Sequence, residues 1–273
     1  MQITKSSPLV LAILLACTFT STAQLPSIGK KPWENYFFVL KQRKFQFGIT
    51  TEGDAVFHPL TKRGEMINEN NPVIFKIEIL ESKSDGKFIS KKINPGSLKS
   101  EQSPALNPDK PVTYTGTVTG DAGFEITFTP SRDGFAVTGK ITDQGKLTNP
   151  LNIAVKIGLR PYIKDTTRTA TETKSFEQRI KRDKFEATIA SGNRRLYDFK
   201  KPVNFHADMP NGVESLIVKS AGYEFTEFKV STESSSKIMF EEQNQIVADG
   251  ADIRWIIPME SNPATDILEI STK

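Results

Sequence analysis

The sequence is poor in cysteine, histidine and tryptophan: its 273 residues include one Cys, two His and two Trp. The cysteine, Cys17, lies in a segment that we expect to be removed. The mature chain would then form no disulfide of its own and would depend on packing for its stability. His58 and His206 are far apart in the sequence and lack the spacing of a zinc site. We interpret both histidines as surface residues at loop edges and expect no bound metal.

Long apolar runs are also missing, apart from one short run near the start. Residues 9–19 are apolar except for Thr18, follow Lys5 and precede small residues at 21 and 23. This order is typical of a signal peptide, which we place at residues 1–23, with cleavage before Gln24. The run is too short to cross a bilayer core of about 30 Å as a helix. We therefore expect an exported, secreted protein located in the periplasm, at the outer membrane or on the cell surface.

The same segment has an alternative interpretation as a lipoprotein signal. Leu14, Leu15 and Ala16 precede Cys17 and approximate a lipobox, in which the cysteine is lipidated and becomes the first mature residue. Leu15 fits the position two before the cysteine poorly. The small residues at 21 and 23 favour ordinary cleavage, and a lipid anchor at Cys17 remains the alternative.

Neither sign of charge dominates the chain. There are 36 Lys and Arg against 32 Asp and Glu, and removal of Lys5 with the signal lowers the net charge from +4 to +3. An excess this small does not indicate nucleic acid as a partner. The basic residues form short, scattered clusters that we interpret as solvated strand edges and turn flanks, with an anionic glycan or lipid headgroup as the alternative partner. These clusters lie at 30–31, 41–44, 91–92, 179–184, 194–195 and 200–201.

Catalytic signatures are absent as well. The chain has no Gly-x-Ser-x-Gly elbow, no Walker phosphate loop and no Gly-x-Gly-x-x-Gly turn. We predict no catalytic or cofactor-binding residues, no cofactor, and a protein that is not an enzyme. A glycosidase needs only two facing carboxylates, so an extracellular hydrolase on a β-sandwich scaffold stays an alternative. We interpret the acidic segments 68–71 and 249–252 as turns, because neither matches a regular calcium loop.

What the sequence does contain is alternation of apolar and polar residues. Val112, Tyr114 and Val118 alternate with threonines, and two similar stretches follow before residue 142. This period predicts three consecutive strands with one buried face. The connections at 119–123 and 130–134 carry the Asp and Gly residues of tight turns, so we expect an antiparallel meander.

Further short strands are predicted along the rest of the chain, at 45–49, 73–80, 153–159, 185–189, 216–219, 225–230, 237–240, 253–257 and 267–270. About a dozen short strands separated by turns favour an all-β fold, an antiparallel immunoglobulin-like β-sandwich over residues 24–273. Residues 94–111 contain four prolines and few apolar side chains. We interpret them as a long loop, with a linker between two domains as the alternative.

One short helix is predicted near the mature N-terminus. Pro32 suits a first helical position, and Trp33, Tyr36, Phe37 and Leu40 follow helical spacing. Residues 172–184 fit either a second helix or an extended segment. Trp255 lies between two isoleucines of one predicted strand face and is interpreted as core.

The segment 117–142, with Phe-Glu-Ile-Thr-Phe-Thr-Pro-x-x-Asp-Gly-Phe at 124–135, resembles the strand, Asp-Gly turn, strand order of secretin-associated β-domains. Residues 184–193 show the same order more faintly. The whole chain is similar in character to secreted immunoglobulin-like proteins encoded beside type IV pilus and secretin components in mucus-dwelling bacteria. The resemblance implies an accessory, pilus-associated or surface structural protein and supplies no catalytic residues.

These observations predict a non-enzymatic exported protein, either a type IV pilus or secretion accessory or a cell-surface structural or adhesion factor. Its partners would be proteins of such an assembly, bound by pairing at exposed strand edges. Residues 45–49 and 267–270, near the two mature ends, are the expected edge strands. The alternative is a glycan-binding module that stacks a sugar on an exposed Trp33 or Trp255.

Overall fold

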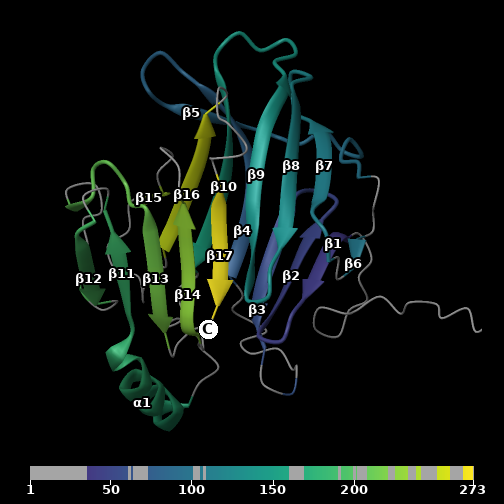
Figure 1. The fold of residues 1–273 in the computed structure, drawn as a ribbon. Helices are drawn as coiled ribbons and strands as arrows, with labels where there is room; N and C mark the ends of the chain where they lie inside the picture. The colour runs from purple at the N-terminus through teal and green to yellow at the C-terminus, as the bar shows by residue number, and fades with distance from the viewer. Residues whose placement is uncertain are drawn as a thin grey trace, which may run out of the picture.

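The computed structural model describes residues 36–60, 63, 73–100, 105–106, 109–159, 169–189, 192–198, 201, 208–220, 225–232, 238–240, 251–258 and 267–272. These residues form 17 strands, one α-helix and one short 3-10 helix. The strands lie in two sheets that face each other, as Figure 1 shows. All the strand pairs of the described residues are antiparallel except β1 with β6. The predicted antiparallel β-sandwich is confirmed.

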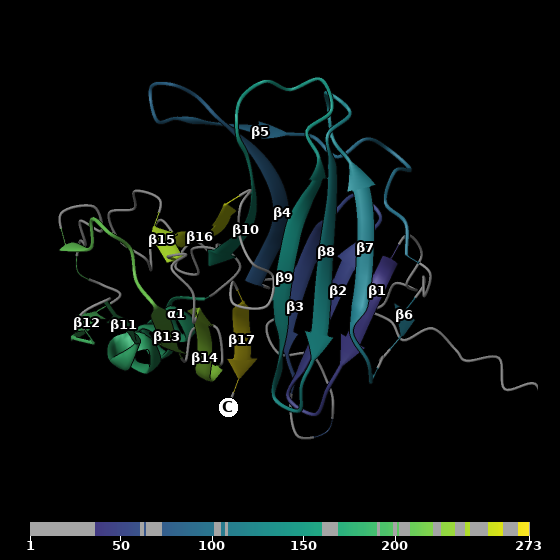
Figure 2. The same cartoon turned by 45° about the horizontal axis from the view of Figure 1, so that its top comes forward.

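The nine-stranded sheet has the order β15-β16-β10-β4-β3-β2-β1-β6, and β5 pairs with β4 outside this path. β5 extends away from the body of the sandwich in both views (Figure 2). The strands are β1 (Tyr36–Lys41), β2 (Phe45–Thr50), β3 (Asp54–Pro59), β4 (Val73–Ser82), β5 (Phe88–Lys91), β6 (Ala105–Leu106), β10 (Leu151–Leu159), β15 (Ile238–Phe240) and β16 (Ala251–Pro258).

The eight-stranded sheet has the order β12-β11-β13-β14-β17-β9-β8-β7. β12 and β7 therefore lie at its two ends (Figure 2). The strands are β7 (Val112–Thr117), β8 (Gly123–Pro130), β9 (Gly134–Asp143), β11 (Lys184–Thr188), β12 (Arg194–Asp198), β13 (Ser215–Ser220), β14 (Phe225–Thr232) and β17 (Leu268–Thr272).

Phenylalanine side chains from both sheets fill the space between them. Phe47 of β2 stacks on Phe135 of β9 with ring centroids 4.3 Å apart, and Phe57 of β3 meets Phe228 of β14 edge-on at 5.4 Å. All four rings are almost fully buried. Burying aromatic side chains removes large apolar areas from water, and such ring pairs add about 0.5–1.5 kcal/mol beyond that area. This cluster holds the two sheets together without any disulfide.

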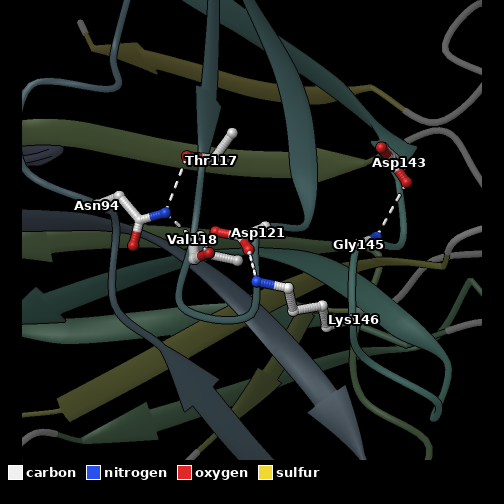
Figure 3. A network of polar contacts seen from close by, with 7 residues as sticks. All are labelled: Asn94, Thr117, Val118, Asp121, Asp143, Gly145 and Lys146. Carbon is white, nitrogen blue, oxygen red and sulfur yellow. Dashed lines mark hydrogen bonds and ion pairs between the residues drawn. The ribbon is translucent and has the colours of Figure 1, made fainter.

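Two turns interlock at the end of the eight-stranded sheet that includes β7 and β8 (Figure 3). Lys146 donates to the carboxylate of Asp121 at 2.5 Å, and its backbone N–H donates to the carbonyl of Gly120. Asn94 donates through its side-chain amide to the Thr117 hydroxyl and to the Val118 carbonyl. The loop after β9 is thereby fixed against the turn between β7 and β8, which makes this network a structural one.

The predicted N-terminal helix is wrong where the structure describes it. Tyr36–Lys41 form β1, which pairs with β2; Pro32 and Trp33 lie outside the described residues. Phe37, Phe38, Val39 and Leu40 are all buried. A short apolar run fits a strand covered on both faces as well as a helix, and pairing with β2 decides in favour of the strand.

The one short helix of the described chain lies elsewhere. It is α1 (Ala170–Arg179), continued by η1 (Ile180–Arg182), and it overlaps the second stretch that the sequence indicated. Thr169 caps it: the Glu172 N–H donates to the Thr169 hydroxyl, while the Thr169 N–H donates to the Glu172 carboxylate. This is a capping box, which corresponds to the motif Thr-x-x-Glu in the sequence.

The predicted edge strands are also wrong. Residues 45–49 belong to β2, which pairs with β1 on one side and β3 on the other. Residues 267–270 overlap β17, which lies between β14 and β9. Nearness to a chain end in sequence does not make a strand an edge, because β1 precedes β2 and pairs with its outer side, while β17 inserts into the middle of its sheet.

Part of the predicted linker at 94–111 is ordered against the sandwich. Lys99 exchanges backbone hydrogen bonds with Thr115 of β7, and Ala105–Leu106 form β6 beside β1. The division into two domains near these residues stays a prediction. None of the helices among the described residues is long and apolar enough to cross a membrane.

Candidate binding site at one end of the eight-stranded sheet

The aromatic and histidine candidates do not form a site in the described chain. Trp255 is fully buried in β16, so its interpretation as core is confirmed and it offers no sugar platform. His58 lies buried on β3, which corrects its predicted place at a surface loop edge. Trp33 and His206 lie outside the described residues. Within those residues no group of three or more His, Cys, Asp or Glu is placed to hold a metal.

Charged side chains on the nine-stranded sheet form ion pairs. Arg254 of β16 contacts Glu78 of β4 at 3.2 Å, and Lys156 of β10 contacts Asp252 at 3.0 Å. Asp252 is the only residue of the acidic segment 249–252 whose ion pair the structure describes; 68–71 lies outside the described part. Since each of these two cations has its own carboxylate, the network neutralises itself.

A concave site of about 700 Å³ lies beside η1, β11, β12 and β13, and we call it the basic pocket. It is open to solvent. The strands β11, β12 and β13 that line it lie at the end of the sheet near α1 (Figure 1). Five cationic side chains surround it, against two carboxylates and two less polar side chains. The lining residues are Lys181, Arg182, Lys184, Lys201 and Lys219, with Asp183, Asp198, Leu196 and Tyr197.

Strand register places three of these charges in one row. Lys184 of β11 lies opposite Asp198 of β12 on one side and opposite Lys219 of β13 on the other. Like charges directly opposite each other on a sheet face are unfavourable. The two lysines therefore repel each other, Asp198 opposite Lys184 offsets part of this repulsion, and the row of three keeps a net charge of +1.

The carboxylate of Asp183 is buried and stabilises the wall of the pocket through a hydrogen bond. Asp183 is only 3% exposed, and its Oδ2 accepts a hydrogen bond from the Ser220 hydroxyl at 2.8 Å. Buried charges require such partners. This bond ties η1 to the end of β13 and so fixes the wall that carries Lys181 and Arg182.

The five cations lack carboxylate partners in the part of the chain that the structure describes. The ion pairs of those residues all join other side chains. None of the five cations forms a further ion pair within this part of the chain. Four of them come from two clusters seen in the sequence, 179–184 and 200–201, and Lys219 comes from a third segment. The clusters expected to be scattered are therefore brought together by the hairpin of β11 and β12.

The floor of the pocket is held in place by aromatic packing. Tyr197 stacks on Phe185 of β11 with ring centroids 4.8 Å apart. Burial is the main cause that raises the pKa of the Tyr197 hydroxyl above its usual value, so this side chain stays neutral at physiological pH. Leu196, in contrast, points to solvent and is 61% exposed. The pocket thus offers positive charge beside a small apolar surface.

Fold and site together define a β-sandwich protein with a concave cationic surface. No protein-family model matches the chain, and neither does any curated protein. Among solved structures the chain is similar to a galactose mutarotase-like protein from Lactobacillus casei ATCC 334. The TM-score is 0.49 and the sequence identity is 10%, over 87% of this chain and 100% of that one.

Proposed function

We propose that this chain is an exported, non-enzymatic β-sandwich protein that binds an acidic segment of a protein partner in its basic pocket. The observation that carries the proposal is the set of five cations around one concave site with no carboxylate partner among the described residues. Long, flexible amines suit the neutralisation of an extended charged ligand. The exposed side chain of Leu196 adds apolar contact at the rim.

The partner class follows from the sequence resemblance. A component of a type IV pilus or secretion assembly, or another cell-surface structure, would present the acidic segment outside the cytoplasm. The protein would then act as an accessory or adhesion factor. The signal peptide predicted at residues 1–23 supports such a location.

Binding of fluorescent poly-L-glutamate to the mature chain tests this proposal. We expect binding that weakens steeply with salt, because the charges are exposed and screened. The double variant Lys184→Glu, Lys219→Glu should bind about tenfold more weakly or worse, equivalent to about 1.4 kcal/mol or more. A matched control is Lys92→Glu, Lys110→Glu, which changes the net charge equally at two exposed positions away from the pocket.

The outcomes separate the alternatives. Loss of binding in the pocket variant alone supports the proposal. Equal losses in both variants would show a response to net charge only and would overturn it. Binding to an acidic polysaccharide such as alginate, with none to polyglutamate, would favour the glycan-binding alternative at the same site.

A further inference from the structure

The hairpin of β4 and β5 projects from the sandwich, and its outer part is exposed. The two strands pair from Ile79 with Lys91 to Ser82 with Phe88, and residues 83–87 connect them. Every residue from 83 to 90 is exposed. The hairpin extends away from the body of the molecule in both views (Figure 1, Figure 2). Its tip is therefore accessible from all sides.

Hydrogen bonds define the turn of this β4–β5 hairpin. The Lys83 N–H donates to the Lys87 carbonyl at 2.8 Å, and the Gly86 N–H donates to the Lys83 carbonyl at 3.0 Å. The Lys87 N–H donates to the Asp85 carboxylate at 3.1 Å. The tip is thus an ordered turn, and the side chains beside it keep a fixed arrangement relative to β5.

Two large apolar side chains directly follow the turn. Phe88 is 44% exposed and Ile89 is 37% exposed, and Leu196 is the only other exposed large apolar side chain among the described residues. Successive residues of a strand point to opposite faces, so each face of the hairpin carries one of the two. A flat protein surface could cover only one face, whereas a lipid interface surrounds an inserted element on both.

Lysines flank this apolar pair. Residues 83–92 contain four lysines and one aspartate. Lys91 is neutralised by an ion pair with Glu81. Lys83 and Lys92 form no ion pair within the residues that the structure describes. The hairpin therefore carries a net positive charge beside its exposed apolar side chains.

The one acidic residue of the turn does not cancel this charge. Asp85 contacts Lys87 at 3.4 Å, and the two side chains are 51% and 79% exposed. An ion pair so exposed contributes little, so Lys87 is able to exchange Asp85 for an external anion. A lysine can direct its ammonium group to such an anion while its aliphatic part lies along an apolar surface.

We propose that the β4–β5 hairpin binds the surface of an anionic phospholipid membrane. Phe88 and Ile89 enter the boundary between headgroups and acyl chains, while the lysines at 83, 87 and 92 contact lipid phosphates. Buried apolar area and attraction to anionic lipid together determine the strength of interfacial binding. With two apolar side chains and three lysines, the binding is weak and reversible. It does not require the acidic ligand of the basic pocket.

Co-sedimentation of the mature chain with lipid vesicles tests the proposal. We expect binding to vesicles of phosphatidylglycerol and phosphatidylcholine in equal parts, much weaker binding to phosphatidylcholine alone, and a decline with added salt. Lys83→Gln, Lys92→Gln should weaken binding to the anionic vesicles by about 25-fold, since each lysine at such a surface contributes about fivefold. A wild-type chain that binds neither kind of vesicle would overturn the proposal and favour a protein as the partner of the hairpin.

A second variant removes the apolar side chains and keeps the charge. Phe88→Ser, Ile89→Ser should weaken binding to anionic vesicles by about tenfold or more. Both side chains are exposed, so its thermal melt should stay close to that of the wild type. Phe88→Leu, Ile89→Leu is the matched control and should retain binding. Equal losses in the serine and leucine variants would contradict a role for apolar insertion.

Phe88→Trp gives a direct readout of insertion. Its emission should shift to shorter wavelength with anionic vesicles, and brominated lipids should quench it. The wild type supplies the background from Trp33 and Trp255. Absence of both the shift and the quenching would overturn insertion at this position.

Two variants with the same loss of charge separate the hairpin from the rest of the surface. Lys110→Gln, Lys174→Gln changes two exposed lysines, one before β7 and one on α1, and should bind vesicles like the wild type. Lys184→Gln, Lys219→Gln in the basic pocket should lose polyglutamate binding and keep vesicle binding. Vesicle binding lost in the pocket variant and kept in the hairpin lysine variant would overturn the membrane proposal alone. Polyglutamate binding lost only in the hairpin variant would overturn the pocket alone.

Discussion

Phe47 and Phe135 stack with their rings 4.3 Å apart, inclined by 24°, and join the second strand of the chain to β9 of the opposite sheet. Both side chains are almost fully buried, and Phe135 also contacts Phe45, Phe75 and Phe128. The sheets are thus connected through one aromatic cluster that includes residues from several strands.

Phe47→Ala should lower the free energy of unfolding by about 3–5 kcal/mol, because it removes buried area and leaves a cavity between the sheets. Urea denaturation followed by tryptophan fluorescence would measure this, since Trp255 is buried in the same core. The exposed Phe88→Ala is the control and should change stability by less than about 0.5 kcal/mol. Similar losses in both variants would contradict a dominant role for the cluster.

Gly145→Ala should destabilise the chain by about 2–4 kcal/mol, from an unfavourable backbone conformation and a steric clash together. Gly145 has φ +58°, and an added Cβ would lie 2.5 Å from backbone atoms of Gly120 and Asp121. Gly86 also has a positive φ, +78°, but open space around it. Gly86→Ala should therefore cost only about 1–2 kcal/mol. Comparison of the two thermal melts isolates the contact between the turns.

Stability should fall in acid partly through Glu81. Hydrogen bonds from Lys91 and Asn149 lower the pKa of this carboxyl below 4.5. The folded state then binds fewer protons than the unfolded state, so this contribution is present above pH 4.5 and is lost as the pH falls through the lowered value. Glu81→Gln should lose less stability than the wild type between neutral pH and that range, in melts recorded over a pH series. An unchanged pH dependence would contradict this assignment.

Ser220→Ala should destabilise the chain by about 1–3 kcal/mol, because the buried carboxylate of Asp183 loses a hydrogen-bond donor. The same change should loosen η1 and weaken polyglutamate binding, although Ser220 does not line the pocket. Ser231→Ala on β14 is a control at a less buried serine. A stable Ser220→Ala variant with wild-type binding would show that this bond does not shape the pocket.

The sequence predicts the strands well where one face is buried. The alternation between residues 111 and 142 matches β7, β8 and β9, which occupy Val112–Thr117, Gly123–Pro130 and Gly134–Asp143. It fails at β1, where Phe37 and Phe38 are both buried and no alternation remains. There only the pairing with β2 distinguishes a strand from a helix.

The basic pocket could not be predicted because it depends on strand order. Lys184 and Lys219 are 35 positions apart and become neighbours only through the register of β11 with β13. The edge at β12 has the same origin. β12 is outermost in its sheet, whereas β2 and β17, nearer the two ends of the sequence, are interior strands. The local sequence of these strands does not indicate their positions in the sheets.

The interior position of β17 governs the order in which the fold can be completed. Among the strands that the structure describes, β17 alone joins the group β12-β11-β13-β14 to the group β9-β8-β7. Until residues 268–272 arrive, that sheet consists of two separate halves, each with an open margin toward the other. Contacts between segments so distant in sequence form slowly. A chain synthesised from its N-terminus would thus leave these two halves of the sheet unjoined until residues 268–272 are available.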